Sequence, residues 1–162
     1  MEAAASVEVI ESVRPLLAVA VARAAAAAIL LLHGRDNLRD MATLCASVVM
    51  FLIVASMAPV VLAGGTVEYT MFQILPGADF AFRVDALGMV FASVSSFLWM
   101  AAAVYSIGYM RSLEEHAQTR FFACFAVSLA AAVGGAFAAN LFTLVIFYEA
   151  LSLVTYPLVY HH

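Results

Sequence analysis

The sequence predicts an all-α membrane protein with about five transmembrane helices in a single membrane domain, residues 15–162. Two observations predict this class. Of the 162 residues, 66% are apolar and 11% are charged, whereas soluble domains carry about half and about a quarter. The apolar residues also form runs that can span hydrocarbon, which takes about 20 helical residues. With a net charge of −4 and no lysine, the chain offers no basic face for nucleic acid.

The first 14 residues are predicted to form a tail before the membrane domain. Glu2, Glu8 and Glu11 precede the first arginine, Arg14, whereas a cleaved signal peptide begins with basic residues. We therefore do not expect this stretch to be a signal peptide, and an amphipathic surface helix or a disordered tail would both suit it.

Five apolar segments follow, and we expect each to be a transmembrane helix. Their ranges are 15–33, 41–63, 87–110, 121–138 and 141–160. A single helix through the last two would be about 60 Å long, twice the thickness of the hydrocarbon core. The chain must therefore turn between them. Gly134, Gly135 and Asn140 mark this turn, with Asn140 as the N-cap of the fifth helix.

The segment between the second and third spans predicts either a short β-hairpin or an ordered loop at the outer surface. Apolar residues alternate loosely with polar ones over residues 67–74 and strictly over residues 80–84. Pro76 and Gly77 lie between these stretches and supply a turn.

The arginines predict an orientation. Four lie in the first and third loops and two on the other side, namely Arg35, Arg39, Arg111 and Arg120 against Arg14 and Arg83. Basic residues favour the cytoplasmic side, so we expect the N-terminus outside and the C-terminus inside. Abundant alanine and arginine without lysine is typical of a GC-rich bacterium, so the expected location is the inner (cytoplasmic) membrane.

No cofactor, metal or nucleic-acid partner is expected. Cys45 and Cys124 lie inside apolar runs without metal-ligand spacing, so they are interpreted as packing residues. The sequence shows no nucleophile–base pair and no phosphate loop. Any enzymatic reaction would belong to a complex of which the chain is one part.

Glu149 is the principal candidate for a functional residue. It lies near the middle of the fifth span, in a segment without lysine or arginine. An ionisable group at this depth is costly and usually faces a bundle interior or a water path. Ser152 and Tyr156 follow three and seven positions later and share its helix face. The hypothesis is a proton path over these three residues. The alternative is a protonated glutamate that hydrogen-bonds a neighbouring helix for packing.

Arg23 is the second charge within a predicted span. It could act as an electrostatic partner of Glu149 inside the bundle. It could also extend its long side chain to the interface, or mark a shifted start of the first span.

Three features give the chain a family resemblance. Asp85 opens the third span in "FRVDALGMVFASVSSFLWMAAAVYSIGYM", and Tyr109-Met110 closes it. The block "RFFACFAVSLAAAVGGAFAANLFTLVIFYEALSLVTYPLV" then contains Glu149, and the early "RPLLAVAV" matches as well. The chain resembles the proton-conducting antiporter-like subunits of complex I, Mrp antiporters and membrane-bound hydrogenases, with the D-type polypeptide of the Mrp antiporters nearest. The likeness covers essentially the whole chain, but only the N-terminal third of such a protein.

The resemblance implies that Glu149 is the membrane-embedded carboxylate of a proton path. It also implies a lysine partner on a later helix, in a fold of a dozen or more helices built from inverted repeats. This chain contains no lysine, so other membrane subunits would supply that residue and the missing helices. The expected function is a component of a proton or sodium/proton translocating complex. A non-conducting structural or assembly subunit, or a truncated relative, is the alternative.

Overall fold

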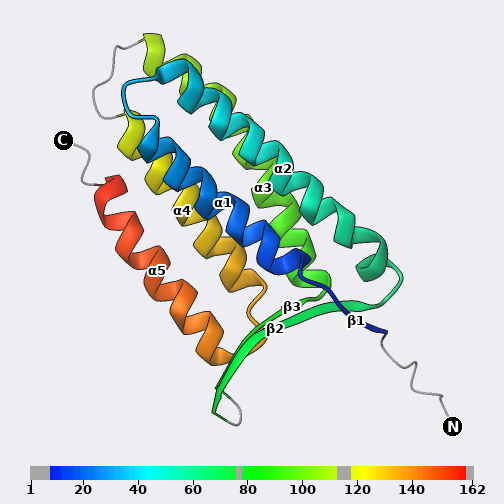
Figure 1. Ribbon diagram of the computed structural model, residues 1–162. Coiled ribbons are helices and arrows are strands. Elements are labelled where there is room, and N and C mark those ends of the chain that lie inside the picture. Colours follow the sequence, from blue (N-terminus) through cyan, green and yellow to red (C-terminus); the bar gives the residue numbers. More distant parts are fainter. Residues whose placement is uncertain (1–7, 76–77, 113–117, 160–162) are drawn as a thin grey trace, which may run out of the picture.

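The computed structural model describes residues 8–75, 78–112 and 118–159. It contains a bundle of helices with a small sheet at one end (Figure 1). The helices are α1 (Arg14–Leu31), α2 (Asp36–Leu62), α3 (Ala86–Ser112), α4 (Gln118–Ala136) and α5 (Leu141–Val159). The strands are β1 (Val9–Glu11), β2 (Thr66–Leu75) and β3 (Ala78–Val84). The predicted all-α membrane class and the five helices are confirmed.

The helices are long and apolar enough to suit a membrane. By length and composition, α1 to α4 can each cross a bilayer, and α5 contributes a shorter apolar stretch, Leu141–Pro157. Helix α2 also extends past the predicted span, since it begins at Asp36 rather than at residue 41. Residues 36–40, interpreted from sequence as loop, therefore form the first turn of a helix.

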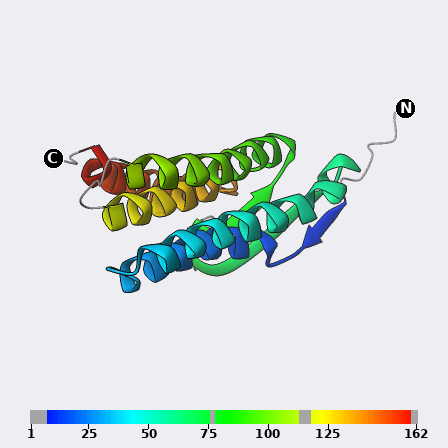
Figure 2. The ribbon, with the colours of Figure 1, turned by 90° about the horizontal axis from the view of Figure 1, so that it is seen from above.

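The central helix of the bundle is α4, which packs against α1, α3 and α5. Helix α2 packs against both α1 and α3. Seen from above, α1 and α2 lie on one side, with α3, α4 and α5 on the other (Figure 2). In Figure 1, α4 lies between α1 and α5.

Small side chains allow α1 and α4 to approach closely. Each helix presents four buried alanines, Ala18, Ala22, Ala25 and Ala26 on α1 and Ala123, Ala126, Ala130 and Ala131 on α4. Lipid tails are as apolar as the side chains, so the hydrophobic effect does not drive helices together inside a bilayer. Close packing of small residues contributes to their association instead. The alanine-rich first span thus serves as a packing surface.

The hairpin between α2 and α3 is confirmed, and the ordered-loop alternative is not what forms. β2 and β3 pair antiparallel from Val67–Val84 to Leu75–Ala78. Its predicted turn, Pro76-Gly77, lies outside the described residues. Val67, Phe82 and Val84 are buried against the helix ends, as their alternation predicts.

The tail prediction is wrong for residues 9–11, because β1 adds a third strand to the sheet, parallel to β2. The Thr66 amide donates to the carbonyl of Glu8 at 2.9 Å, and the Ser12 amide to that of Glu68 at 3.0 Å. The strand that pairs with β1 is β2, more than 50 residues away in sequence. Its backbone groups form the hydrogen bonds that the backbone of the tail needs. Residues 1–7 lie outside the described part of the chain.

Candidate functional site

Glu149 lies on the outward side of α5. Its side chain is exposed, as are those of Ser152 and Tyr156, so the three form one polar stripe on the surface of the bundle. The Ser152 hydroxyl donates to the Tyr148 carbonyl at 3.0 Å. Among the described residues, no ion pair reaches Glu149. The periodicity argument thus placed the three residues on one face, and the structure shows that this face points away from α4.

Arg23 is exposed on α1, close to the middle of the helix. Within the described ranges it forms no ion pair with Glu149. The two residues lie on helices that each pack against α4 (Figure 1). The structure therefore presents both charges on the surface of the bundle and does not join them.

The start of α5 is fixed by hydrogen bonds to the sheet. Asn140 caps the helix, because its Oδ1 accepts from the Thr143 amide at 2.9 Å. Its Nδ2 donates to the Asp79 carbonyl at 2.6 Å, and the buried Thr143 hydroxyl accepts from the Ala81 amide at 3.1 Å. The predicted N-cap is confirmed, and it ties the helix that carries Glu149 to β3.

Farther along, the ring of Phe147 packs α5 against both β3 and α4. The Phe147 ring lies 5.8 Å from that of Phe80 and 5.7 Å from that of Phe82. A Cβ at Gly134 of α4 would overlap the Phe147 ring. Since Phe147 is only 5% exposed and has the sheet behind it, it has little room to move. Gly134 is therefore the residue that lets α5 approach α4.

This contact gives a stability prediction. Gly134→Ala is expected to lower the free energy of unfolding by about 1–3 kcal/mol, the usual cost of overpacking. The matched control is Gly108→Ala in α3, where an added Cβ meets nothing within 4 Å; it should be neutral or stabilising, because Ala favours helix over Gly. Thermal unfolding of the two variants in detergent makes the comparison. Equal shifts for both would show that the Phe147 contact is not tight.

At the other end of the bundle, a network of charges joins three helices. Asp40 is 4% exposed, and its Oδ1 accepts from Arg39 Nε at 3.1 Å and Nη2 at 2.9 Å. Its Oδ2 accepts from Arg111 Nε at 3.0 Å and Nη2 at 2.6 Å. Arg39, 2% exposed, also donates to Asp36 at 2.8 Å and to Gln118 at 2.7 Å. The network therefore links α2 with α3 and α4.

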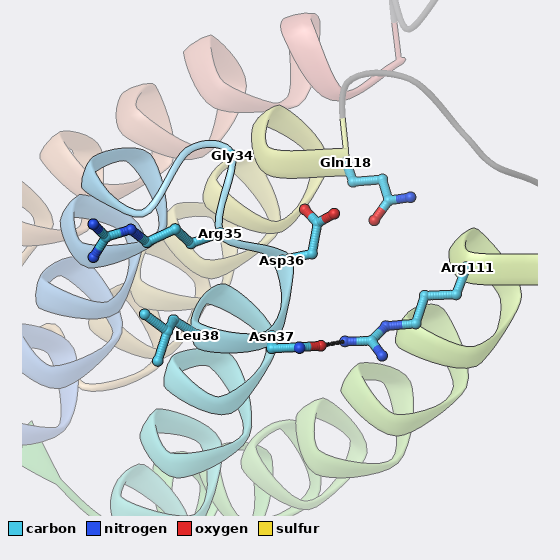
Figure 3. Close-up of a pocket in the computed structure, with 7 residues that line it drawn as sticks. All are labelled: Gly34, Arg35, Asp36, Asn37, Leu38, Arg111 and Gln118. Carbon is cyan, nitrogen blue, oxygen red and sulfur yellow. Dashed lines mark hydrogen bonds between the residues drawn. The ribbon is translucent and has the colours of Figure 1, made fainter.

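The exposed side of this network borders a hollow of about 700 Å³ (Figure 3). Its lining consists of Gly34, Arg35, Asp36, Asn37, Leu38, Arg111 and Gln118. In the close-up Arg111 reaches toward Asn37, to which it donates at 2.9 Å, whereas Arg35 extends away from the other side chains. Most of the charged side chains of this network already form ion pairs. The network therefore acts as a brace that holds the three helices together.

Sequence reasoning missed this network. It treated Arg39 and Arg111 as loop charges, although the structure places them inside α2 and in the last turn of α3. The available signal was local: Asp36 and Arg39 are spaced i, i+3 and can pair on one helix face. The burial of Arg39 against the Phe122 ring, 5.3 Å from the guanidinium carbon, depends on α4 and has no local signal.

The described residues offer no group of three or more His, Cys, Asp or Glu side chains that could hold a metal ion. Fold and site together define a multi-pass membrane protein with a carboxylate on the outward face of one helix and a charged brace at one end.

Comparison with known proteins narrows this class. The family described as the N-terminus of chain 5 of NADH-ubiquinone oxidoreductase (complex I) matches residues 76–122. A probable K(+)/H(+) antiporter polypeptide of the A/B type from Rhizobium meliloti (strain 1021) is 30% identical over 119 residues. That match covers 72% of this chain and 12% of the relative, so the chain spans about an eighth of that protein's length. The resemblance to an antiporter-like membrane protein is confirmed.

Proposed function

We propose that the chain is a component of a proton-translocating membrane complex in which Glu149 relays protons. The observation that carries the proposal is a carboxylate halfway along an apolar helix, exposed on the bundle surface and without an ion-pair partner in the described part of the chain. Such a group is too costly to leave facing lipid. We expect its partner to be a lysine on a neighbouring helix supplied by another membrane subunit, as the sequence resemblance implies.

Ser152 and Tyr156 extend the polar stripe by two turns toward the C-terminal end of α5, so they are placed to pass a proton along that face. Arg23 would act only electrostatically, because a guanidinium stays protonated. The ion exchanged for the proton is sodium or potassium, and potassium is included because the similar Rhizobium meliloti protein is described as a probable K(+)/H(+) antiporter component. The braced end faces the cytoplasm and the sheet faces outward, in the inner membrane of a bacterium.

The test is gentle detergent extraction of the chain from native membranes, followed by mass spectrometry of the polypeptides that co-purify. We expect membrane subunits that add further helices, among them one with a lysine inside a span. Recovery of the chain alone, from membranes whose proton flux does not change when its gene is deleted, would contradict the proposal and leave a scaffold or a truncated relative.

A further inference from the structure

A groove runs between α1 and α5 over the surface of α4. It encloses about 240 Å³. Ala26 and Leu30 form its α1 wall, and Leu153 and Pro157 form its α5 wall. Arg120, in the first turn of α4, lies at the end nearest the charged brace. Apart from that arginine, the lining is apolar or thiol, as expected for a surface that a membrane component covers.

Helix geometry extends the α1 wall of the groove to a charge. Arg23 lies three and seven residues before Ala26 and Leu30, so it is on the groove side of α1. Glu149 lies four and eight residues before Leu153 and Pro157, but its side chain points away from α4, so it lies outside the groove, beyond the α5 wall. Both side chains are exposed in the bundle. The groove thus leads from Arg120 at the braced end, past apolar side chains, to the guanidinium of Arg23 on its α1 wall.

The two charges also lie at the same depth. Both α1 and α5 start at the sheet and run in the same direction (Figure 1). Arg23 is nine residues after the first residue of α1, and Glu149 is eight after that of α5. At a rise of about 1.5 Å per residue, they are about 13 and 12 Å from those starts. A single straight helix laid in the groove would therefore meet Arg23 at its centre, with Glu149 at the same depth on the outer face of α5.

If a lipid acyl chain occupied the groove, the guanidinium of Arg23 would face hydrocarbon. Arg23 is more than two helical turns from either end of α1, farther than its side chain extends, so it cannot reach water along α1 alone. Charges at this depth pair with one another or with polar groups of a neighbouring helix. Among the described residues Arg23 has no ion-pair partner. Charge complementarity therefore requires an acidic group from the occupant.

We propose that the groove binds one transmembrane helix of a second membrane polypeptide, and that this helix presents a carboxylate to Arg23 at mid-depth. Exposed Ala20 and Ala27, three residues before and four after Arg23, lie beside it and let the partner backbone approach. This proposed interface is independent of the proton path. It depends on Arg23 and would form whether or not Glu149 conducts protons.

The test uses synthetic leucine-rich transmembrane peptides and the full chain in lipid nanodiscs. The peptides carry one Glu, Lys or Leu at their centre, or one Glu moved two turns toward an end, with a dansyl acceptor and no tryptophan. Energy transfer from Trp99, the chain's single tryptophan, measures binding. We expect the central-Glu peptide to bind about tenfold more tightly than the other three, in line with polar contacts between membrane helices.

Two variants of the chain make the assignment specific. Arg23→Gln should remove the tenfold advantage, whereas Arg35→Gln, which removes an exposed arginine at the braced end, should keep it. Equal binding of all peptides, tighter binding of the Lys peptide, or an advantage that survives Arg23→Gln would each overturn the proposal. Cross-linking from Ala27→Cys in native membranes identifies the occupant. A product with a second polypeptide through a helix that has an intramembrane acid supports the proposal, and a product with another copy of this chain overturns it.

Discussion

Glu149→Gln is expected to reduce proton flux through the assembled complex to the level of membranes that lack the chain. Glutamine keeps the size and hydrogen-bonding capacity of the side chain but cannot release or take up a proton. Because Glu149 is exposed on α5 rather than packed in the bundle, the substitution should leave the helices and their assembly unchanged. Flux is measured in everted vesicles from cells in which the variant replaces the native copy, with recovery of the complex checked in parallel.

Three further substitutions separate relay from packing. Glu149→Asp should retain part of the flux, since the group still titrates but is shorter. Glu68→Gln removes a carboxylate that pairs with Arg83 on the hairpin at 2.6 Å, and it should leave flux intact. If Glu149→Gln conducts like the native chain while Glu149→Leu fails to assemble, the residue is a packing group and the relay proposal is wrong.

Local patterns predicted most of the fold. The apolar runs were each about one bilayer thick, which set the number of helices and the turn near Asn140. Strict alternation at Phe80, Phe82 and Val84 indicated a hairpin strand with an ordered loop as the alternative; β3 is what forms, and the structure buries the last two residues. These features succeeded because they depend on neighbours within a few residues, where period and turn chemistry act directly.

Contacts between distant segments were not predictable in this way. β1 is only three residues long, and its parallel pairing with β2 depends on where α1 begins and where α2 ends. The brace shows the same limit, because Asp40 meets Arg111 across 71 residues. At the candidate site, spacing placed Glu149 and Ser152 on one face, but the direction of that face follows from the fit of Phe147 against Gly134.

Asp40→Leu is expected to lower the free energy of unfolding by about 3 kcal/mol, within the range for removing one partner of a buried ion pair. Asp40 receives two donors from Arg39 and two from Arg111. Without it, Arg39 remains 2% exposed and keeps Asp36 as its carboxylate partner. That remaining partner, together with the half-exposed side chain of Arg111, places the expected loss at the lower end of the range. Denaturation with SDS in mixed micelles measures it.

The comparison variants decide whether the brace stabilises through charge or through packing. Arg83→Met breaks the ion pair with Glu68, whose side chains are 55% and 31% exposed, and should cost no more than about 1 kcal/mol. A combined Arg39→Met, Asp40→Leu and Arg111→Met variant should recover much of the loss seen for Asp40→Leu, because apolar groups of similar volume can replace a buried ionic cluster. If Asp40→Leu is as mild as Arg83→Met, water reaches the cluster and the brace does not hold α2, α3 and α4 together. If the combined variant is as unstable as Asp40→Leu alone, the cluster provides geometry that packing cannot replace.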